Sequence, residues 1–425
     1  MSATNRRQFL QGTAALTAGA MLGRSAVAAN DKLHVACIGV RGQGGSLLHQ
    51  FAREPDVTIT HIVDLDPSVR ERRAGEIVAK TTQRPKLIAN YEELLADKNV
   101  DVFVIGTPDH WHALPTIHGC MNGKDVYVEK PDGHNILEGK TMVAAARKHQ
   151  RVVQMGTQAR SASYLPAAIE YVQSGAMGKV IYARAWETDR QRPVPAVADS
   201  SPPAGIDYDR WLGSAPVRPF NTNRFHGSWR WYFDYGCGDL GNDGVHRLDY
   251  ARALLGVDAF TAVSCSGGKF FFEDSQEWPD TMLVNYEYPG KLLSYEMRIW
   301  SGPKLFGITE GAVVYGDNGY LMLTNTGWQA FDSAGKLVKE MSGKDNLARH
   351  VRNFLDGVKS RRPESLNQEI ASGHLSSLLC HAGNIAWRTG KKLKFDPATE
   401  TFDDKEANGY LGREYRKGYE LPTIA

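Results

Sequence analysis

The apolar positions in the N-terminal part of the chain form short strands that alternate with amphipathic helices. Residues 33–40 are rich in β-forming side chains, 41–45 form a glycine-rich turn, and 46–53 have one apolar face. The further strands expected are 57–63, 100–106, 125–128 and 152–155, and the further helices are 69–80, 113–122 and 136–149. This alternation predicts an α/β fold that begins with a parallel Rossmann sheet over 31–155.

The pattern changes after about residue 160. The strands expected there are 180–187, 261–266, 281–288, 291–299 and 312–315, and the helices are 167–174, 346–360 and 370–388. Short Gly turns between neighbouring strands indicate an antiparallel or mixed sheet. We therefore expect a substrate-binding α+β domain over 156–395 with a large open sheet. A homo-oligomer of this chain would form through that sheet.

Two segments show little periodicity. Residues 188–245 are rich in Pro, Trp, Tyr and Gly, which predicts a long structured excursion rather than a linker. Residues 396–425 are expected to form a C-terminal surface tail.

The first 28 residues have the features of an export signal. Arg6 and Arg7 precede a weakly apolar Ala/Gly/Leu run, and Ala26-Val27-Ala28 offers a small-x-small cleavage pattern. This order resembles a twin-arginine signal, which predicts a periplasmic protein. The alternative is an N-terminal membrane anchor, but three glycines make the stretch short and poorly apolar for a span, so we expect no stable membrane insertion.

The composition argues against some classes of function and does not by itself indicate one. A hydrophobic fraction of 42%, a charged fraction of 23% and a net charge of +2 describe a globular protein without the strong positive field that nucleic acid requires. The five cysteines are widely spaced and lack a CxxC pair or a His at metal spacing, so neither a disulfide framework nor a metal site is indicated.

The turn after the first strand is the candidate cofactor site. Gly39, Gly42 and Gly44 surround a position where a helix N-terminus can hold a pyrophosphate, although Arg41 replaces the second glycine of the GxGxxG frame. Asp64 ends the second strand, where a carboxylate accepts hydrogen bonds from ribose hydroxyls and repels a 2′-phosphate. The sequence thus favours NAD over NADP, the alternative being a tight turn without a ligand.

Three further segments, taken together and in order, resemble the Gfo/Idh/MocA family of oxidoreductases. They are Thr107-Pro108-Asp109-His110-Trp111-His112, Glu129-Lys130-Pro131 and Gly241-Asn242-Asp243-Gly244-Val245-His246-Arg247-Leu248-Asp249. The resemblance implies that Lys130 lies beside the nicotinamide and the reacting carbinol, where its ammonium favours an alkoxide-like oxygen. It also implies cofactor-lining positions at Thr107, Pro108, His110, His112, Glu129 and Gln158, and it directs Arg160 toward the substrate.

The third segment departs from the family pattern Asp-x-x-x-His. His246 keeps its place and, with a pKa near the working pH, is expected to take the hydroxyl proton. Asn242 stands where the family has Asp, and the carboxylate of Asp243 comes one residue later. Asp243 is either a catalytic group or a cap of the helix that carries His246.

Aromatic residues precede this motif. Arg230, Trp231 and Tyr235 are candidate substrate contacts because aromatic faces with interleaved polar groups suit a pyranose, although such a cluster also suits a core. The leading hypothesis is a dehydrogenase or reductase of a sugar, glycoside or cyclitol with a tightly bound NAD and Lys130 and His246 as the acid-base pair. The alternatives are a redox-neutral NAD-dependent glycosidase and a non-catalytic sugar-binding protein.

Overall fold

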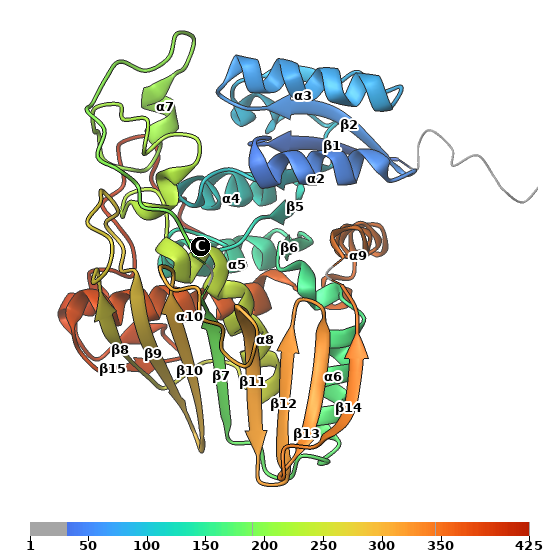
Figure 1. Ribbon diagram of the computed structural model, residues 1–425. Helices are drawn as coiled ribbons and strands as arrows, with labels where there is room; N and C mark the ends of the chain where they lie inside the picture. Colours follow the sequence, from blue (N-terminus) through green and yellow to red (C-terminus); the bar gives the residue numbers. More distant parts are fainter. Residues whose placement is uncertain (1–31, 189, 345, 425) are drawn as a thin grey trace, which may run out of the picture.

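The computed structural model describes residues 32–188, 190–344 and 346–424. The expected signal segment lies outside the described residues. Two α/β units stand one above the other, the Rossmann domain over a second domain with a broad sheet (Figure 1).

The Rossmann sheet is parallel and has the strand order β3-β2-β1-β4-β5-β6. Its strands are β1 (Leu33–Ile38), β2 (Val57–Val63), β3 (Lys86–Ile88), β4 (Val102–Ile105), β5 (Asp125–Val128) and β6 (Val153–Met155). Its helices are α2 (Gly42–Arg53), α3 (Pro67–Lys80), α4 (Ala113–Met121) and α5 (Ile136–Lys148). The order reverses at β1 and β4, and ligands bind at such a switch point outside the carboxyl ends of the strands. The predicted Rossmann fold is confirmed.

The second sheet is mixed and mostly antiparallel, with the order β14-β13-β12-β11-β7-β10-β9-β8-β15-β16. Its strands are β7 (Tyr182–Glu187), β8 (Ala262–Gly268), β9 (Thr281–Tyr288), β10 (Lys291–Arg298), β11 (Glu310–Gly316), β12 (Gly319–Thr324), β13 (Gly327–Asp332), β14 (Leu337–Ser342), β15 (Leu393–Asp396) and β16 (Thr401–Phe402). Only β7 and β10 pair in parallel. The large mixed sheet expected from the sequence is therefore confirmed.

Helices cover one face of this sheet, and Figure 1 shows the other face toward the viewer. The covering helices are α6 (Tyr164–Gln173), α8 (Val245–Leu255) and α10 (Ile370–Thr389). The remaining helices are α7 (Tyr208–Leu212), α9 (Leu347–Ser360) and α11 (Lys405–Asn408), and short 3-10 turns lie at Tyr91–Leu94, Asp109–Trp111, Gln158–Ser161, Ser228–Trp231 and Pro363–Ser365.

Strands β3, β12, β13, β14, β15 and β16 were absent from the sequence expectations. Strands β12, β13 and β14 are joined by tight turns, and β12 alternates buried and partly buried positions as a half-covered strand should. The helix α9 belongs by sequence to the second half but packs on the Rossmann core, where the rings of Phe354 and Phe51 lie 6.2 Å apart.

The C-terminal segment, expected to be a surface tail, lies largely at the surface and is anchored to both domains. Phe402 and Ala407 are buried in the core of the second domain, and Tyr419 packs edge-on against Trp111 at 5.6 Å. The backbone of the tail also bonds to the Rossmann domain, since Leu137 N–H donates to the carbonyl of Leu411. Burial of these apolar side chains fixes the segment across both domains.

Candidate active site

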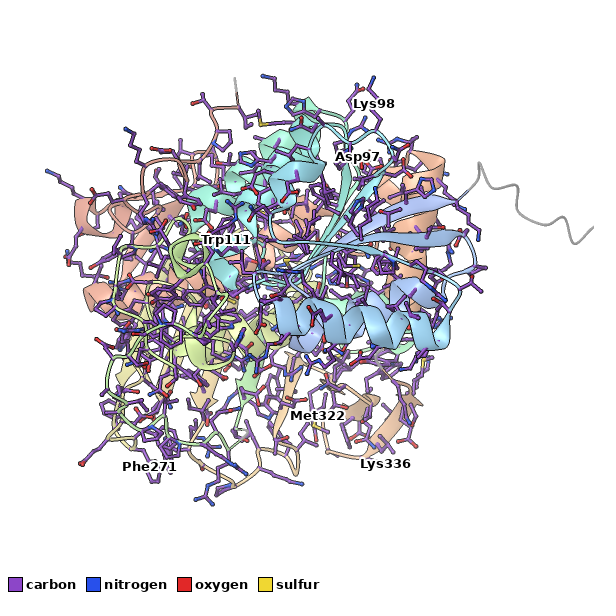
Figure 2. The ribbon with its side chains drawn as sticks, turned by 90° about the horizontal axis from the view of Figure 1, so that it is seen from above. Asp97, Lys98, Trp111, Phe271, Met322 and Lys336 are labelled. Carbon is purple, nitrogen blue, oxygen red and sulfur yellow. The ribbon has the colours of Figure 1, made fainter. Side chains whose placement is uncertain are left out.

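A pocket with a volume of about 450 Å³ opens between the two domains at the carboxyl ends of the Rossmann strands. Many predicted site residues meet there: Gly39, Arg41, Gly42, Asp64, Thr107, Pro108, His112, Glu129, Lys130, Gln158, Arg230, Asn242, Asp243 and His246 all line it. Trp111, whose ring also lines the pocket, lies where the Rossmann helices meet the second domain (Figure 2).

The turn from β1 into α2 has the form that a bound dinucleotide needs. Gly39 has a φ of +72°, and a Cβ at Gly44 would stand 1.8 Å from the carbonyl oxygen of Gly39. Gly44 therefore serves the packing of the helix against the turn and does not itself line the pocket. A Cβ at Gly42, the first residue of α2, would meet nothing within 4 Å, so the helix N-terminus is open to an anion. Arg41 occupies the N-cap position and is exposed.

The backbone holds the carboxylate of Asp64 at the end of β2. One of its oxygens accepts a hydrogen bond from Val40 N–H and the other from Asp66 N–H, each at 3.0 Å. Burial raises the pKa of Asp64, while these two hydrogen bonds oppose the rise. The carboxylate is thus fixed where a Rossmann protein contacts the adenosine ribose.

Lys130 follows β5 and reaches the second domain. Its Nζ donates to the carbonyl oxygen of Asn242 at 2.5 Å and lies 3.4 Å from the side-chain oxygen of the same residue. The amide of Asn242 in turn donates to Asp243 at 2.8 Å. Behind Lys130, the buried carboxyl of Glu129 accepts from Gln43 at 3.1 Å, which ties the strand end to α2. The ammonium is therefore positioned by groups from both domains.

A π-helical turn, Leu240–Gly244, precedes α8 and presents His246 to the pocket. Burial, together with the cations of Lys130 and Arg247, lowers the pKa of His246 well below its ordinary value of 6.5. The expectation of a pKa near the working pH was therefore wrong. At neutral pH the imidazole is uncharged and can accept a proton.

Sequence reasoning missed Asp239, which lies at the start of the π-helical turn. Both its carboxyl oxygens are buried without a hydrogen-bond partner among the residues that the structure describes. Burial raises the pKa of Asp239 well above its ordinary value, and Asp243 raises it further, against the pull of Arg230 and Arg247. The available signal was the helical spacing of four residues between Asp239 and Asp243.

His110 and His112, in the loop after β4, both contact backbone carbonyl oxygens. His112 lines the pocket, but its ring nitrogens lie 2.6 Å from the carbonyl oxygen of Pro131 and 2.9 Å from that of Thr107. His110 lies outside the pocket, against the carbonyl of Trp211 at 3.0 Å, and burial lowers its pKa to about 3. The expected cofactor contact of His110 is corrected to a contact between domains.

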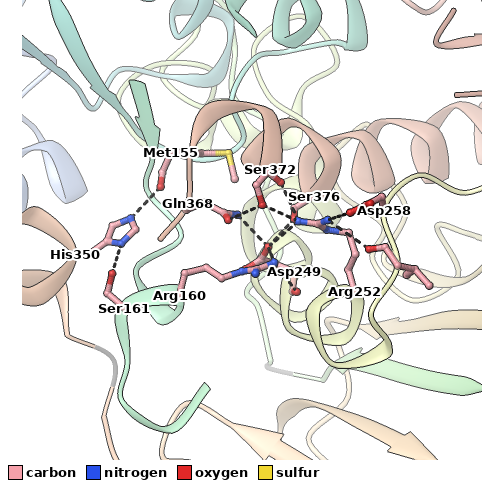
Figure 3. Close-up of polar contacts among 11 residues, drawn as sticks. Met155, Arg160, Ser161, Asp249, Arg252, Asp258, His350, Gln368, Ser372 and Ser376 are labelled. Carbon is pink, nitrogen blue, oxygen red and sulfur yellow. Dashed lines mark hydrogen bonds and ion pairs between the residues drawn. The ribbon is translucent and has the colours of Figure 1, made fainter. Parts of the chain in front are cut away.

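Arg160 does not line the pocket, contrary to its expected substrate contact, and its side chain lies against Asp249 (Figure 3). It forms a two-pronged ion pair with the buried Asp249, with distances of 2.7 and 2.8 Å. Burial opposes the ionisation of Asp249, yet the neighbouring guanidinium lowers the pKa of this carboxyl to about 2. Gln368 and Ser376 donate to the same carboxylate, so Arg160 joins α8 and α10 to the domain junction.

The substrate-contact candidates near the aromatic cluster divide between the pocket and the core. Arg230 lines the pocket, whereas Trp231 and Tyr235 lie in the core of the second domain, with Tyr235 fully buried. The rings of Trp231 and Tyr235 fill the interior beneath the irregular segment 188–245, so they belong to the core. Phe225 and His226 also line the pocket, and sequence reasoning missed them because their segment has no periodicity.

Neither a metal centre nor a membrane span is found among the described residues. No group of three or more His, Cys, Asp or Glu side chains there could hold a metal ion. No helix in this part of the chain is long and apolar enough to cross a membrane. All five cysteines are free.

Sequence comparison identifies the family. The model of the oxidoreductase family NAD-binding Rossmann fold matches residues 33–157, and that of the C-terminal alpha/beta domain matches 186–273 and 312–421. A twin-arginine translocation signal matches residues 3–23. The chain belongs to the Gfo/Idh/MocA oxidoreductase family, has an NAD-binding Rossmann domain and carries a signal for export by the twin-arginine route.

The curated relatives include glycosidases. A glycosyl hydrolase family 109 protein 1 of Shewanella sp. (strain ANA-3) is 26% identical over 207 residues, and an alpha-N-acetylgalactosaminidase of Shewanella oneidensis is 25% identical over 207 residues. Each alignment covers 43% of this chain and 45% of the relative. The chain thus spans less than half the length of these relatives.

Solved structures share the fold over most of the chain. Aldose-aldose oxidoreductase from Caulobacter crescentus, complexed with glycerol, is 18% identical with a TM-score of 0.64, covering 86% of this chain and 100% of that one. The WlbA dehydrogenase from Bordetella pertussis, in complex with NADH and UDP-GlcNAcA, is 17% identical with a TM-score of 0.64, covering 86% and 99%. Levoglucosan dehydrogenase, in complex with NADH and levoglucosan, is 18% identical with a TM-score of 0.64, covering 85% and 99%.

Proposed function

We propose that the protein is a periplasmic oxidoreductase that transfers hydride between a retained NAD and a hydroxyl-bearing carbon of a sugar, glycoside or cyclitol. The observation that carries this proposal is the convergence of Lys130 and His246 on one pocket with the glycine turn and Asp64. Lys130 and His246 provide the acid-base groups, and the glycine turn with Asp64 provides a dinucleotide site. A protein that only bound a sugar would have no evident need of both.

The residues present fit the nucleotide. The open N-terminus of α2 at Gly42 would receive the pyrophosphate, Asp64 the adenosine ribose, and Thr107, Pro108 and Gln158 would line the nicotinamide side. NAD, when bound, supplies hydride acceptance and donation. We favour NAD over NADP because the carboxylate of Asp64 would repel a 2′-phosphate.

The chemistry left to the chain is proton transfer and charge stabilisation. The Lys130 ammonium is held where it can stabilise negative charge that develops on the substrate oxygen. The neutral imidazole of His246 accepts the hydroxyl proton as the carbon is oxidised and returns it in the reverse direction. Asn242 orients Lys130 through its carbonyl, and Asp243 contributes a carboxylate at the pocket wall.

Export gives a reason for retention of the cofactor. A twin-arginine signal carries a folded protein, so the nucleotide can cross with it. Outside the cytoplasm no ample nicotinamide pool would replace a lost molecule, and retention requires a dissociation constant well under 1 µM, or roughly 8 kcal/mol of binding free energy. The cofactor must then be restored within each cycle, by a second substrate or by a redox-neutral reaction.

A second candidate is redox-neutral cleavage of a glycoside. It is favoured by the curated relatives named as family 109 glycosyl hydrolases and as an alpha-N-acetylgalactosaminidase. Transient oxidation of a ring hydroxyl acidifies the neighbouring C–H bond. Loss of that proton then expels the glycosidic leaving group, and water addition with return of the hydride completes a reaction without net oxidation.

One set of assays tests the proposal. Mass spectrometry of mature protein denatured after purification should detect NAD, and absence of NAD together with no binding of added NAD would refute the site. A single sugar should change the redox state of no more than one cofactor per site, with sustained turnover only when a second acceptor is present. Release of p-nitrophenol from p-nitrophenyl α-N-acetylgalactosaminide without NADH accumulation would favour the second candidate.

A further inference from the structure

The pocket extends past Asp64 to a second end that the proposed chemistry does not use. Its Rossmann wall there consists of Leu65, Asp66, Ala89 and Tyr91, which follow β2 and β3. Because a residue in the position of Asp64 contacts the adenosine ribose, these side chains surround the place of the adenine.

The opposite wall comes from the second domain. We call residues 204–235 the strap; they include α7 and form part of the green segment that rises beside the blue Rossmann domain in Figure 1. The strap side chains that line the pocket are Arg210, Trp211, Phe225, His226, Trp229 and Arg230. Aromatic rings and cationic groups thus face the nucleotide end of the pocket from a segment outside the Rossmann fold.

His226 joins the strap to the Rossmann domain. Its Nε2 lies 2.9 Å from a carboxylate oxygen of Asp66, which also caps the N-terminus of α3. Its backbone has a φ of +62°, a left-handed conformation that is rare for a residue with a Cβ. Such strain persists only where surrounding contacts enforce it, and here the imidazole contact and the packing of Phe225 provide them.

A second contact lies beside the first. Arg210 forms an ion pair with Glu92, and its guanidinium stands 6.0 Å from the ring centre of Trp111. The indole N–H of Trp111 donates to the carbonyl oxygen of Trp211 at 2.9 Å. The strap therefore contacts the Rossmann domain through His226, through Arg210 and through the backbone of Trp211.

We propose that the strap is the adenosine-binding wall of the nucleotide pocket and that the contacts His226–Asp66 and Arg210–Glu92 restrict nucleotide release. Trp211 and Phe225, which are largely buried in the core of the second domain, contribute apolar surface to the pocket wall. The strap bars the exit that an open Rossmann crevice would leave. This inference rests on the proposed function only in taking a nicotinamide dinucleotide as the ligand.

The test measures the dissociation of NADH in the absence of any sugar. Mature protein loaded with NADH is mixed with excess NAD, and the loss of Trp-sensitised NADH emission is followed. His226→Ala and Arg210→Ala should each raise the dissociation rate about tenfold, since each removes a contact that must break before release. The double variant should lose its nucleotide on dialysis while the wild type keeps it.

Arg224→Gln is the matched control. Arg224 also lies in the strap and pairs with Asp199 at 2.9 Å, but that pair lies within the second domain and does not line the pocket. Its NADH dissociation rate should equal that of the wild type. Thermal melting of each variant checks the fold, and the two single variants decide the outcome if the double variant does not fold.

The possible results separate the two proposals. Faster release from the strap variants with an unchanged control supports the inference. Wild-type rates in both single variants would overturn it, as would an equal acceleration in Arg224→Gln. A wild-type protein that binds no NADH would refute the proposed function itself, whereas a variant that releases NADH rapidly but still oxidises sugar at saturating NAD separates retention from chemistry.

Discussion

The ammonium of Lys130 lies 2.5 Å from the backbone carbonyl of Asn242, a residue 112 positions away in the chain. Lys130 follows strand β5, and Asn242 lies in the π-helical turn that precedes α8, the helix that carries His246. A carbonyl oxygen cannot neutralise the lysine as a carboxylate would, so the positive charge stays available to a substrate oxygen. This contact joins the two domains beside the candidate reacting residues.

Removal of the ammonium should affect the rate far more than binding. We expect Lys130→Met to bind NAD within several-fold of the wild type and to lower turnover about a hundredfold or more, as for loss of a positioned electrostatic group. Single-turnover kinetics with bound cofactor measure the effect. Turnover near the wild-type rate would refute the role of Lys130.

The pH profile tests His246. Because its pKa lies well below 6.5, the base should remain neutral through neutral pH, and the rate should fall only on the acidic side as the imidazole takes a proton. We expect His246→Ala to lose this acidic limb and to slow turnover about a hundredfold. If the acidic limb survives in the variant, the base lies elsewhere and Asp243 is the next candidate.

Asn242→Asp restores the usual arrangement of the family. The new carboxylate would stand near the Lys130 ammonium, where the side-chain oxygen of Asn242 lies at 3.4 Å. We expect the variant to fold and to retain activity, as measured by melting temperature and steady-state rate. An inactive and poorly folded variant would show that the asparagine is a structural requirement of the π-helical turn.

Asp64 should discriminate between the cofactors. We expect Asp64→Ala to weaken NAD about tenfold or more and NADP far less, because the lost carboxylate binds ribose hydroxyls and repels a 2′-phosphate. Equilibrium titration of both nucleotides measures the ratio. Asp64→Asn keeps an oxygen for Val40 N–H and so controls for collapse of the turn; equal weakening of both nucleotides in both variants would contradict the prediction.

Asp239 should make stability fall as the pH rises. Its raised pKa means that the folded protein holds this proton more tightly than the unfolded chain, so its contribution is complete below the unfolded pKa of about 3.9 and is lost above it. Asp239→Asn should therefore melt at a higher temperature than the wild type, with a difference that grows as the pH rises from the unfolded pKa toward the folded pKa. A difference independent of pH would show that the carboxyl does not titrate in this way.

Arg160 should prove structural. Arg160→Met removes the two-pronged partner of the buried Asp249 carboxylate and leaves it the more distant cation of Arg252, 3.9 Å away. We expect a loss of about 3–5 kcal/mol in the free energy of unfolding. Arg147→Met, which breaks the partly exposed pair with Glu369, should cost at most about 1 kcal/mol. A change in the KM for sugar at wild-type stability would instead support the original substrate contact.

The sequence alone determined the Rossmann architecture and the candidates for the reacting groups. Strand β2 occupies the expected 57–63, and the helix expected at 136–149 is α5, Ile136–Lys148, because the period of apolar residues is a local property. The resemblance of their motifs to the family points to Lys130 and His246, and the structure brings both to one pocket.

Only the tertiary structure decided which candidates meet. Arg160, which the resemblance directs toward the substrate, pairs with Asp249 instead. His226, in a segment without periodicity, contacts Asp66. The irregular strap takes its conformation from partners distant in sequence rather than from its own pattern. The pKa of His246 likewise depends on burial and on cations from other segments, which no local sequence pattern encodes.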